Sequence, residues 1–414
     1  MPHVLFVAPR LLENTNRYVE AFASLDGVKL SVISSDPGES IPKSLRKHIA
    51  AHYRIANTLD TAQLIDAGRR IAAVEGRIDR LTAALEQLQM PMAETRDALR
   101  IEGMSAAVAQ AFRDKDHMKK ILRAHRVPVA KSALVRSVAA LERFVGETGF
   151  PVILKPQAGV GAKSTWRIES ADDIRALVKK GVVPSAERPL QVEEFVRARE
   201  HTCETVTVRG KPVWFSGTRY FPSPLEVLET PWVQYCVMLP REEDDPTWTR
   251  FHPINTAALA ALFGDEAKTA SGSAITHMEW FLREDGSALV NEVGARPPGV
   301  MIMPLMSIAN EANMIAKWAE LIAFDRFTPL TRKWAAGCAF LRGQGNGPRV
   351  TSVTGVEEAA AKVAGSLVEM RAPKVGASRS DGYEGEGWAT VRHETTDGVK
   401  HALRTIIETI QVRY

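Results

Sequence analysis

Two glutamates, Glu279 and Glu292, stand in neighbouring segments that have the pattern of one β-hairpin. Asp285-Gly286 between these segments is typical of a tight two-residue turn, because both turn positions need a positive φ. Counting outward from this turn places Glu279 directly opposite Glu292, with Cβ atoms roughly 5 Å apart. Carboxylates that close repel each other unless a cation lies between them, and Mg²⁺ readily takes one or two carboxylates. A basic side chain between them, such as Arg283 or Arg296, is the alternative.

The length and composition predict a folded protein of two or three domains. The chain has 414 residues, of which 45% are hydrophobic and 25% charged, so disorder is excluded. The net charge of +4 is spread along the chain, which gives little support to nucleic-acid binding. Three widely spaced cysteines, Cys203, Cys236 and Cys338, argue against a disulfide framework and a zinc site.

The N-terminus enters a buried-strand pattern without a preceding basic segment, and no run of about 18 apolar residues is present. We therefore expect no membrane span, no signal peptide and a cytoplasmic location. Strand patterns at 3–8 and 28–34 flank a helical pattern at 14–24, which predicts the βαβ start of an open α/β domain. No glycine-rich dinucleotide fingerprint follows the first strand.

A glycine loop at 157–165 lies between two predicted strands, 151–156 and 166–168. It is not a P-loop, because no helix follows and the Gly-Lys-Ser/Thr spacing is absent. A flexible lid over phosphates is the alternative. The remaining patterns predict helices at 59–74, 94–124 (with a helix of its own at 114–124), 254–263, 308–323, 356–364 and 396–410, and strands at 77–83, 133–135, 190–196 and 203–208.

Several short motifs follow one another in a fixed order. They are Asp114-Lys115 with Met118-Lys119, the segment 150–156, Gly159-Val160-Gly161 with Ser164, Glu193-Glu194-Phe195-Val196 followed by Glu200, His277-Met278-Glu279, and the segment 291–299. In this order the chain resembles the ATP-grasp superfamily over nearly its whole length. The Glu-Val-Gly-Ala-Arg-Pro run at 292–297 is similar to that of carboxylate-amine ligases of the L-amino-acid ligase or dipeptide synthase group.

The resemblance implies an α/β fold in three parts. These are an N-terminal open α/β (pre-ATP-grasp) domain at 1–112, a two-lobed ATP-grasp domain at 113–330 with a lid lobe at about 125–196, and a small C-terminal α+β domain at 331–414.

The resemblance also implies how ATP is bound. Lys115 and Lys155 would hold the α- and β-phosphates as compact positive charges. Gly159, Gly161 and Ser164 would form the lid, where glycines let backbone N–H groups approach the phosphates. The main chain of Glu193, Glu194 and Val196 would contact adenine, and Glu200 would accept hydrogen bonds from the ribose.

The implied reaction is carboxylate activation. Glu279 and Glu292 would hold Mg²⁺, or Mn²⁺ in its place, against the β- and γ-phosphates. The substrate carboxylate, for which an amino acid is expected, would form an acyl phosphate, and an amine would then displace phosphate to give an amide. Arg296 would stabilise charge on the transferring phosphoryl group or on the tetrahedral intermediate. No covalent enzyme intermediate is needed.

Some roles stay open at this stage. His277 either contacts substrate or a metal-bound water, or is structural. Gly294 stands where many relatives carry an asparagine that ligates metal, and Asn291 is expected to point to the opposite face of the strand from Glu292. A biotin-carboxylase-like or purine-pathway enzyme is an alternative, as is a non-catalytic ATP-binding sensor or partner module. A homodimer is compatible with the resemblance.

Overall fold

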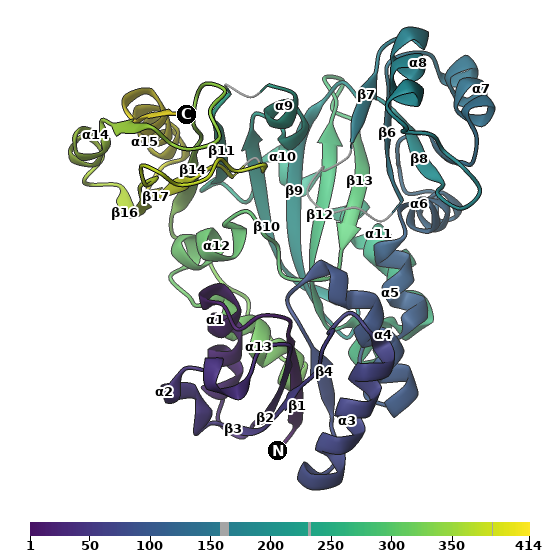
Figure 1. Ribbon diagram of the computed structural model, residues 1–414, viewed down its shortest axis with the longest axis vertical. Helices are drawn as coiled ribbons and strands as arrows, with labels where there is room; N and C mark the ends of the chain where they lie inside the picture. Colours follow the sequence, from purple (N-terminus) through teal and green to yellow (C-terminus); the bar gives the residue numbers. More distant parts are fainter. Residues whose placement is uncertain (158–164, 231–232, 383) are drawn as a thin grey trace.

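The N-terminal region forms a small parallel sheet, as the sequence predicts. The computed structural model describes residues 1–157, 165–230, 233–382 and 384–414. Strands β1 and β2, which precede and follow helix α1 in the sequence, pair in parallel. The strand order is β3-β2-β1-β4 (Figure 1). The sequence did not reveal β3, whose residues are only half-buried or exposed. The elements are β1 (His3–Ala8), α1 (Glu13–Ala23), β2 (Lys29–Ser34), η1 (Gly38–Ser40), α2 (Lys43–Arg46), β3 (Ile49–Arg54), α3 (Thr61–Glu75) and β4 (Arg80–Thr82).

The helical pattern at 94–124 forms three helices, and the last of them confirms the predicted helix at 114–124. Arg100 adopts φ +53° and ends the first of them, whereas the side chains of Ser105 and Asp114 cap the next two by accepting backbone N–H groups. The capped start of the third helix places Lys115 in its first turn. The elements are η2 (Glu86–Leu88), α4 (Gln89–Leu99), α5 (Ala106–Arg113) and α6 (Lys115–Ala124).

A four-stranded antiparallel sheet of order β5-β8-β6-β7 follows. Helices α7 and α8 cover one face with apolar residues such as Leu141 and Ile174, and the other face turns toward α6 (Figure 1). Lys155 and Glu193 lie on neighbouring strands of this sheet. The elements are β5 (Ser132–Val135), α7 (Val138–Thr148), β6 (Val152–Pro156), β7 (Trp166–Ile168), α8 (Ala171–Lys179) and β8 (Leu190–Glu194).

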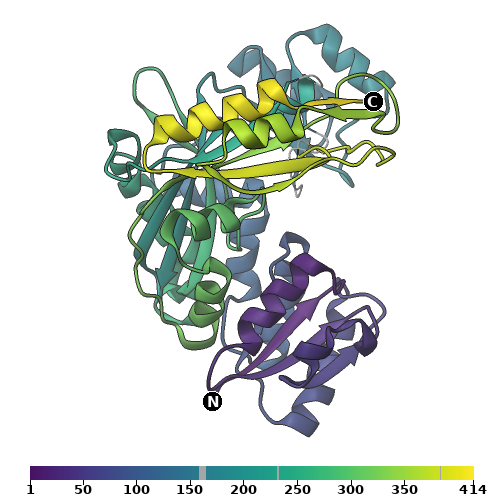
Figure 2. The same cartoon turned by 90° about the vertical axis from the view of Figure 1, so that its left-hand side faces the viewer.

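The largest sheet has eight strands in the order β13-β12-β9-β10-β11-β14-β17-β16. It runs without a break from the central region into the C-terminal region, and helices α14 and α15 lie over its C-terminal strands (Figure 2). The division at residue 331 therefore stays a proposal. The strands are β9 (Arg199–Val208), β10 (Lys211–Phe221), β11 (Tyr235–Leu239), β12 (Ala274–Leu282), β13 (Ala288–Gly294), β14 (Ala335–Leu341), β16 (Leu367–Arg371) and β17 (Gly387–His393).

The helical pattern at 308–323 is also divided. Glu311 takes φ +48°, which ends one helix, and the Asn313 side chain caps the next. The remaining elements are α9 (Pro224–Glu229), α10 (Pro246–Thr249), α11 (His252–Phe263), η3 (Gly264–Lys268), η4 (Ala270–Gly272), α12 (Ile302–Asn310), α13 (Met314–Phe324), β15 (Ser352–Thr354), α14 (Val356–Lys362), α15 (Thr396–Thr409) and β18 (Gln411–Arg413). None of the described helices has the length and apolar character needed to cross a bilayer.

The hairpin of β12 and β13 pairs Glu279 with Glu292, as predicted, but its turn differs from the prediction. Arg283 pairs with Ser287 across a three-residue loop in which Gly286 has φ +81°. This loop shifts the register by one residue relative to the predicted two-residue turn, so Trp280 pairs with Val290. A β-bulge at the next step inserts one extra residue and shifts the register back.

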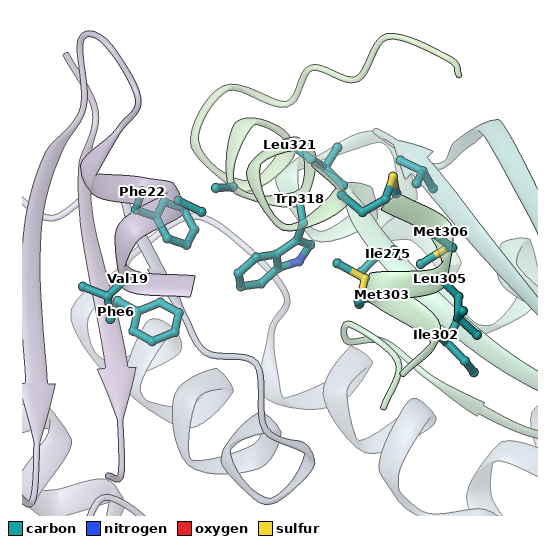
Figure 3. Close-up of a cluster of buried hydrophobic side chains, with 14 of the residues drawn as sticks. Phe6, Val19, Phe22, Ile275, Ile302, Met303, Leu305, Met306, Trp318 and Leu321 are labelled. Atoms are coloured by element: carbon teal, nitrogen blue, oxygen red, sulfur yellow. The ribbon is translucent and has the colours of Figure 1, made fainter. Parts of the chain in front are cut away.

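The N-terminal region is joined to the rest of the chain by an aromatic contact. Trp318 of α13 lies between Phe22 and Val19 on one side and the apolar layer of α12 on the other (Figure 3). Its ring meets those of Tyr18 and Phe22 edge-on, at centroid distances of 5.4 and 5.5 Å. Because only 4% of Trp318 is exposed, this contact excludes water from the junction.

We expect Trp318→Ala to lower the free energy of unfolding by about 3–5 kcal/mol, because it leaves a cavity between the two regions. Urea denaturation followed by circular dichroism measures this change. Leu12→Ala is the control, because Leu12 is 65% exposed at the start of α1 and its loss leaves no cavity. Equal midpoints for the wild type and Trp318→Ala would contradict the inferred role of the contact.

Candidate active site

The carboxylates lie in rows across three neighbouring strands, β9, β12 and β13. One row is Thr202, Glu279 and Glu292, and the next is Glu204, His277 and Gly294. Side chains in a row share one face of the sheet, and this face turns away from the buried side chains of Met278 and Trp280. The strand pairing thus gathers acidic side chains from three separate segments.

Lys115 neutralises one of the two carboxylates. Its ammonium lies 2.5 Å from Glu292 Oε1, and the lysine is 5% exposed. Helix α6 aims it there, because Asp114 caps the helix and its other carboxylate oxygen accepts from Gln157 Nε2 at 2.6 Å. Burial disfavours the charged form of Glu292, but Lys115 and Lys155 outweigh it and lower the pKa of this carboxyl. Glu292 is therefore held as a carboxylate.

In the part of the chain that the structure describes, no lysine forms an ion pair with Glu279. Burial and the Glu292 carboxylate raise the pKa of Glu279, whose oxygens lie 3.9 Å from His277 Nε2 and 3.3 Å from Asn291 Nδ2. The side chains of Glu279 and Glu292 are 30% and 27% exposed, so a ligand can reach both from solvent. Among the described residues, no group of three or more His, Cys, Asp or Glu side chains is arranged to hold a metal. Two carboxylates suit Mg²⁺, which takes its other ligands from water and phosphate.

His277 is anchored from behind by a buried carboxylate. Its Nδ1 lies 2.8 Å from Glu204 Oε1, and Glu204 is fully buried. Glu204 also accepts from the hydroxyls of Thr202 and Thr218, at 2.8 and 2.9 Å. This network fixes the imidazole ring with Nε2 toward Glu279.

Two lysines enclose Glu193. Lys119 Nζ lies 2.6 Å from Glu193 Oε1, and Lys155 Nζ lies 3.0 Å from Oε2. Burial lowers the pKa of Lys119 to about 8 against the pull of Glu193. Burial also disfavours the ionised form of Glu193, but the two lysines outweigh it and lower the pKa of Glu193 to about 2. The group is a buried carboxylate with two cations, so one positive charge remains available for an anion.

The predicted adenine segment lies at the end of β8. The N–H groups of Glu194 and Phe195 already donate to the carbonyls of Lys131 and Pro151, at 3.0 and 3.2 Å. The Glu194 side chain accepts from the Lys131 N–H at 2.9 Å. Val196 packs with Ala130 and Leu289 in a small apolar cluster. An adenine contact by the main chain of Val196 stays a prediction.

Glu200 lies one row from Glu279, opposite Phe281 of β12. Burial and the charges of Glu279 and Glu292 raise the pKa of Glu200 to about 8, against the opposing charge of Lys155. Its predicted ribose contact remains untested. The lid residues Gly159, Gly161 and Ser164 lie outside the described residues.

Arg296 follows β13 and is held by the N-terminal region. Its Nε donates to Glu86 Oε2, and its NH1 donates to the Pro297 carbonyl at 2.9 Å. The other oxygen of Glu86 accepts from Arg113 NH1 at 2.6 Å. Glu86 is 8% exposed, so these two guanidinium groups are its charge partners in a buried position. The guanidinium of Arg296 is thus fixed at the end of the row that contains Gly294.

Sequence reasoning missed Glu86, Glu204 and the contact made by Asn291, and it gave Lys119 no role. Alternation along β9 is a signal for Glu204, because it places this residue on the same face as Glu200 and Thr202. The spacing of Lys115 and Lys119, one helical turn apart, is a signal for Lys119. Glu86 carries no local signal, because its partner Arg296 lies 210 residues away.

Asn291 does not point away from Glu279, which corrects the expectation from strand alternation. Its Nδ2 donates to Glu279 Oε2 at 3.3 Å. The cause is the β-bulge, because the extra residue of a bulge does not follow the alternation of the strand.

Known proteins share this arrangement of elements. The family model described as the ATP-binding domain of the carbamoyl-phosphate synthase L chain matches residues 114–209. D-alanine–D-alanine ligase B of Clostridium perfringens is 30% identical over 102 residues, 24% of this chain and 33% of that protein. L-arginine-specific L-amino acid ligase of Bacillus subtilis is 22% identical over 284 residues, 66% of this chain and 64% of that protein. The crystal structure of L-amino acid ligase from Bacillus licheniformis has a TM-score of 0.77 at 17% identity, covering 100% of this chain and 99% of that chain.

The matched segment 114–209 extends from the start of α6 to the end of β9, so the similarity to an ATP-binding domain covers the elements that carry Lys115, Lys155 and Glu193. Over its whole length the chain has a fold similar to that of an L-amino acid ligase. The chain spans a third to just under two thirds of the length of the curated relatives named above, at 33% and 64%.

We expect Glu193→Gln to destabilise the protein by about 3–5 kcal/mol at neutral pH, because it leaves Lys119 and Lys155 buried without their carboxylate. Urea denaturation of both proteins measures this difference. Glu187→Gln is the matched control, because it makes the same chemical change at a residue that is exposed in the same lobe.

The loss of stability in Glu193→Gln should depend on pH. The pKa of Glu193 is about 2 in the folded protein against an ordinary 4.5, so its stabilising contribution is fully present above about 4.5 and is lost as the pH falls toward 2. The difference in unfolding free energy between wild type and Glu193→Gln should therefore shrink across that range. A difference that stays constant would refute the charge pairing.

Proposed function

We propose that this protein is an ATP- and Mg²⁺-dependent carbon–nitrogen ligase. It activates a small carboxylate, an amino acid by preference, as an acyl phosphate and joins it to an amine, releasing ADP and phosphate. The observation that carries the proposal is the pairing of Glu279 with Glu292 on the same sheet face, where Lys115 forms an ion pair with Glu292 and no lysine of the described residues does so with Glu279. An unbalanced carboxylate pair of this kind is suited to a hard cation that carries nucleotide phosphates.

The groups around this pair are suited to a nucleotide. Lys115, Lys119 and Lys155 bring three ammonium groups to two carboxylates, Glu193 and Glu292, so the cluster without Glu279 has net positive charge. Such a charge attracts phosphates, which would replace part of the contact that the lysines make with protein carboxylates. A bound Mg²⁺ would neutralise charge on the β- and γ-phosphates.

The chemistry proceeds in two steps. A substrate carboxylate oxygen attacks the γ-phosphorus of ATP, the bond to the β–γ bridging oxygen breaks, and ADP leaves. An amine nitrogen then attacks the acyl carbon, loses a proton, and phosphate leaves to give the amide. Arg296, held by Glu86, is suited to stabilise negative charge on the transferring phosphoryl group or the tetrahedral intermediate.

The substrate class rests on similarity. Both curated relatives are named as ligases of amino acids, D-alanine in one and L-amino acids with L-arginine specificity in the other. We propose an amino acid as the carboxylate for this chain on that ground. Bicarbonate, as used by a carboxylase-type enzyme, and a sensor without turnover are the alternatives that the next experiment separates.

ADP release should require Mg²⁺ and rise sharply only when a carboxylate and an amine are supplied together. A coupled ADP assay across pairs of amino acids measures this, with bicarbonate as a separate arm. Hydroxylamine in place of the amine should trap the acyl phosphate as a hydroxamate. Glu292→Gln should reduce ADP release to background, because it removes a carboxylate from the pair.

The outcomes are distinct. Release with bicarbonate alone would favour the carboxylase alternative, and ADP binding without turnover for any pair would favour the sensor. Full activity of Glu292→Gln would contradict the assignment of the carboxylate pair.

Arg296→Ala should lower kcat by roughly 10²-fold if the guanidinium stabilises the transition state. Steady-state kinetics with the best responding pair measure kcat and KM separately. A rise in KM with kcat unchanged would instead make Arg296 a substrate clamp.

Two controls accompany this variant. ADP affinity in EDTA reports whether the nucleotide site is intact in Arg296→Ala. Glu86→Gln keeps the guanidinium but removes its charged anchor, so it should lower kcat less than Arg296→Ala does. An equal loss in both variants would indicate that the buried ion pair matters for folding rather than for chemistry.

A further inference from the structure

The two oxygens of Glu279 have different neighbours. Oε1 faces His277 Nε2 at 3.9 Å, and Oε2 accepts a hydrogen bond from Asn291 Nδ2 at 3.3 Å. Asn291 is half-buried at the bulge of β13, directly before Glu292. The amide of Asn291 therefore reaches Glu279, the carboxylate that forms no ion pair with a lysine of the described residues.

In the next row, position 294 supplies no side chain that could take the place of Asn291 beside Glu279 Oε2. Gly294 offers none, and a Cβ built there would lie 3.4 Å from Glu86 Oε2 and 3.9 Å from Arg296 Cγ. A side chain at 294 would therefore begin in van der Waals contact with the Glu86 carboxylate. Glu86 itself is occupied, because its two oxygens accept from Arg113 and Arg296.

The charges around the site also favour a neutral donor. Lys115 already lies on Glu292, and a second ammonium on Glu279 would compete with a metal for this carboxylate. An amide N–H fixes one carboxylate oxygen without adding charge and leaves the other free. Partners that orient a metal ligand in this way typically contribute 10–100-fold to metal affinity.

We propose that Asn291 is a positioning residue of the metal site, which orients Glu279 through its amide N–H. This inference rests on the proposed function, because it assumes that Glu279 and Glu292 hold a divalent cation with ADP or ATP. The bulge is the device that brings Asn291 to Glu279.

The test is Mn²⁺ affinity in the presence of ADP, measured from the loss of the free Mn²⁺ signal in electron paramagnetic resonance. Asn291→Ala and the nearly isosteric Asn291→Leu should each weaken Mn²⁺ binding by about 10–100-fold. ADP affinity in EDTA should stay unchanged in both, which a purely structural role would not predict. The leucine variant keeps the side-chain volume, so a shared loss cannot be assigned to a cavity.

Two controls separate this inference from the proposed function. Ser287→Ala removes a side-chain hydrogen bond at the turn of the same hairpin, away from Glu279, and should leave Mn²⁺ affinity unchanged. Glu292→Gln should abolish Mn²⁺ binding. If Glu292→Gln loses the metal while both Asn291 variants bind it like wild type, the role of Asn291 is overturned and the metal site stands. If the wild type binds no Mn²⁺ with ADP, both proposals are overturned.

Discussion

Charge balance around two neighbouring carboxylates is the constraint on which the rest of the site depends. Glu279 and Glu292 lie opposite each other on one sheet face, and like charges there destabilise the fold. Lys115 offsets one of them from the first turn of α6, whereas Glu279 lies beside His277 and Asn291. Among the described residues, no lysine or arginine pairs with Glu279, which lies at a position that solvent reaches. Such a carboxylate lowers stability unless a cation is bound, which links ligand binding to the stability of the hairpin.

The N-terminal region is part of the same charge balance. Glu86 accepts from Arg113 and Arg296, so three buried or half-buried charges connect the end of β4 to the end of β13. The Trp318 contact holds the two regions together on another side of the molecule. A Cβ at position 294 would lie 3.4 Å from Glu86 Oε2, so the N-terminal region also lines the space beside Gly294. The position of Arg296 is therefore fixed by contacts between the N-terminal region and the end of β13, and not by the local sequence alone.

Local patterns predicted the parts of this site that lie within one segment. Periodicity predicted the parallel start of the chain and the two strands of the hairpin, whereas the role of Lys115 was predicted from the order of the motifs. Strands β10 and β11 were missed. The breaks at Arg100 and Glu311, in the patterns at 94–124 and 308–323, were missed as well, because these left-handed residues are not glycines. The contacts of Glu86 and Glu193 join segments far apart in the sequence, so only the folded chain brings their partners together.

The hairpin itself explains why a correct pairing followed from an incorrect turn. With the three-residue loop alone, Glu279 would stand opposite Asn291, and Glu292 would turn to the face of Met278, which is fully buried. The bulge inserts one residue and returns Glu292 to the face of Glu279. The same insertion releases Asn291 from the alternation of the strand and lets its amide reach Glu279. One irregularity in β13 therefore sets both the carboxylate pair and its neutral hydrogen-bond donor, because the same sequence paired without the bulge would place Asn291 rather than Glu292 opposite Glu279.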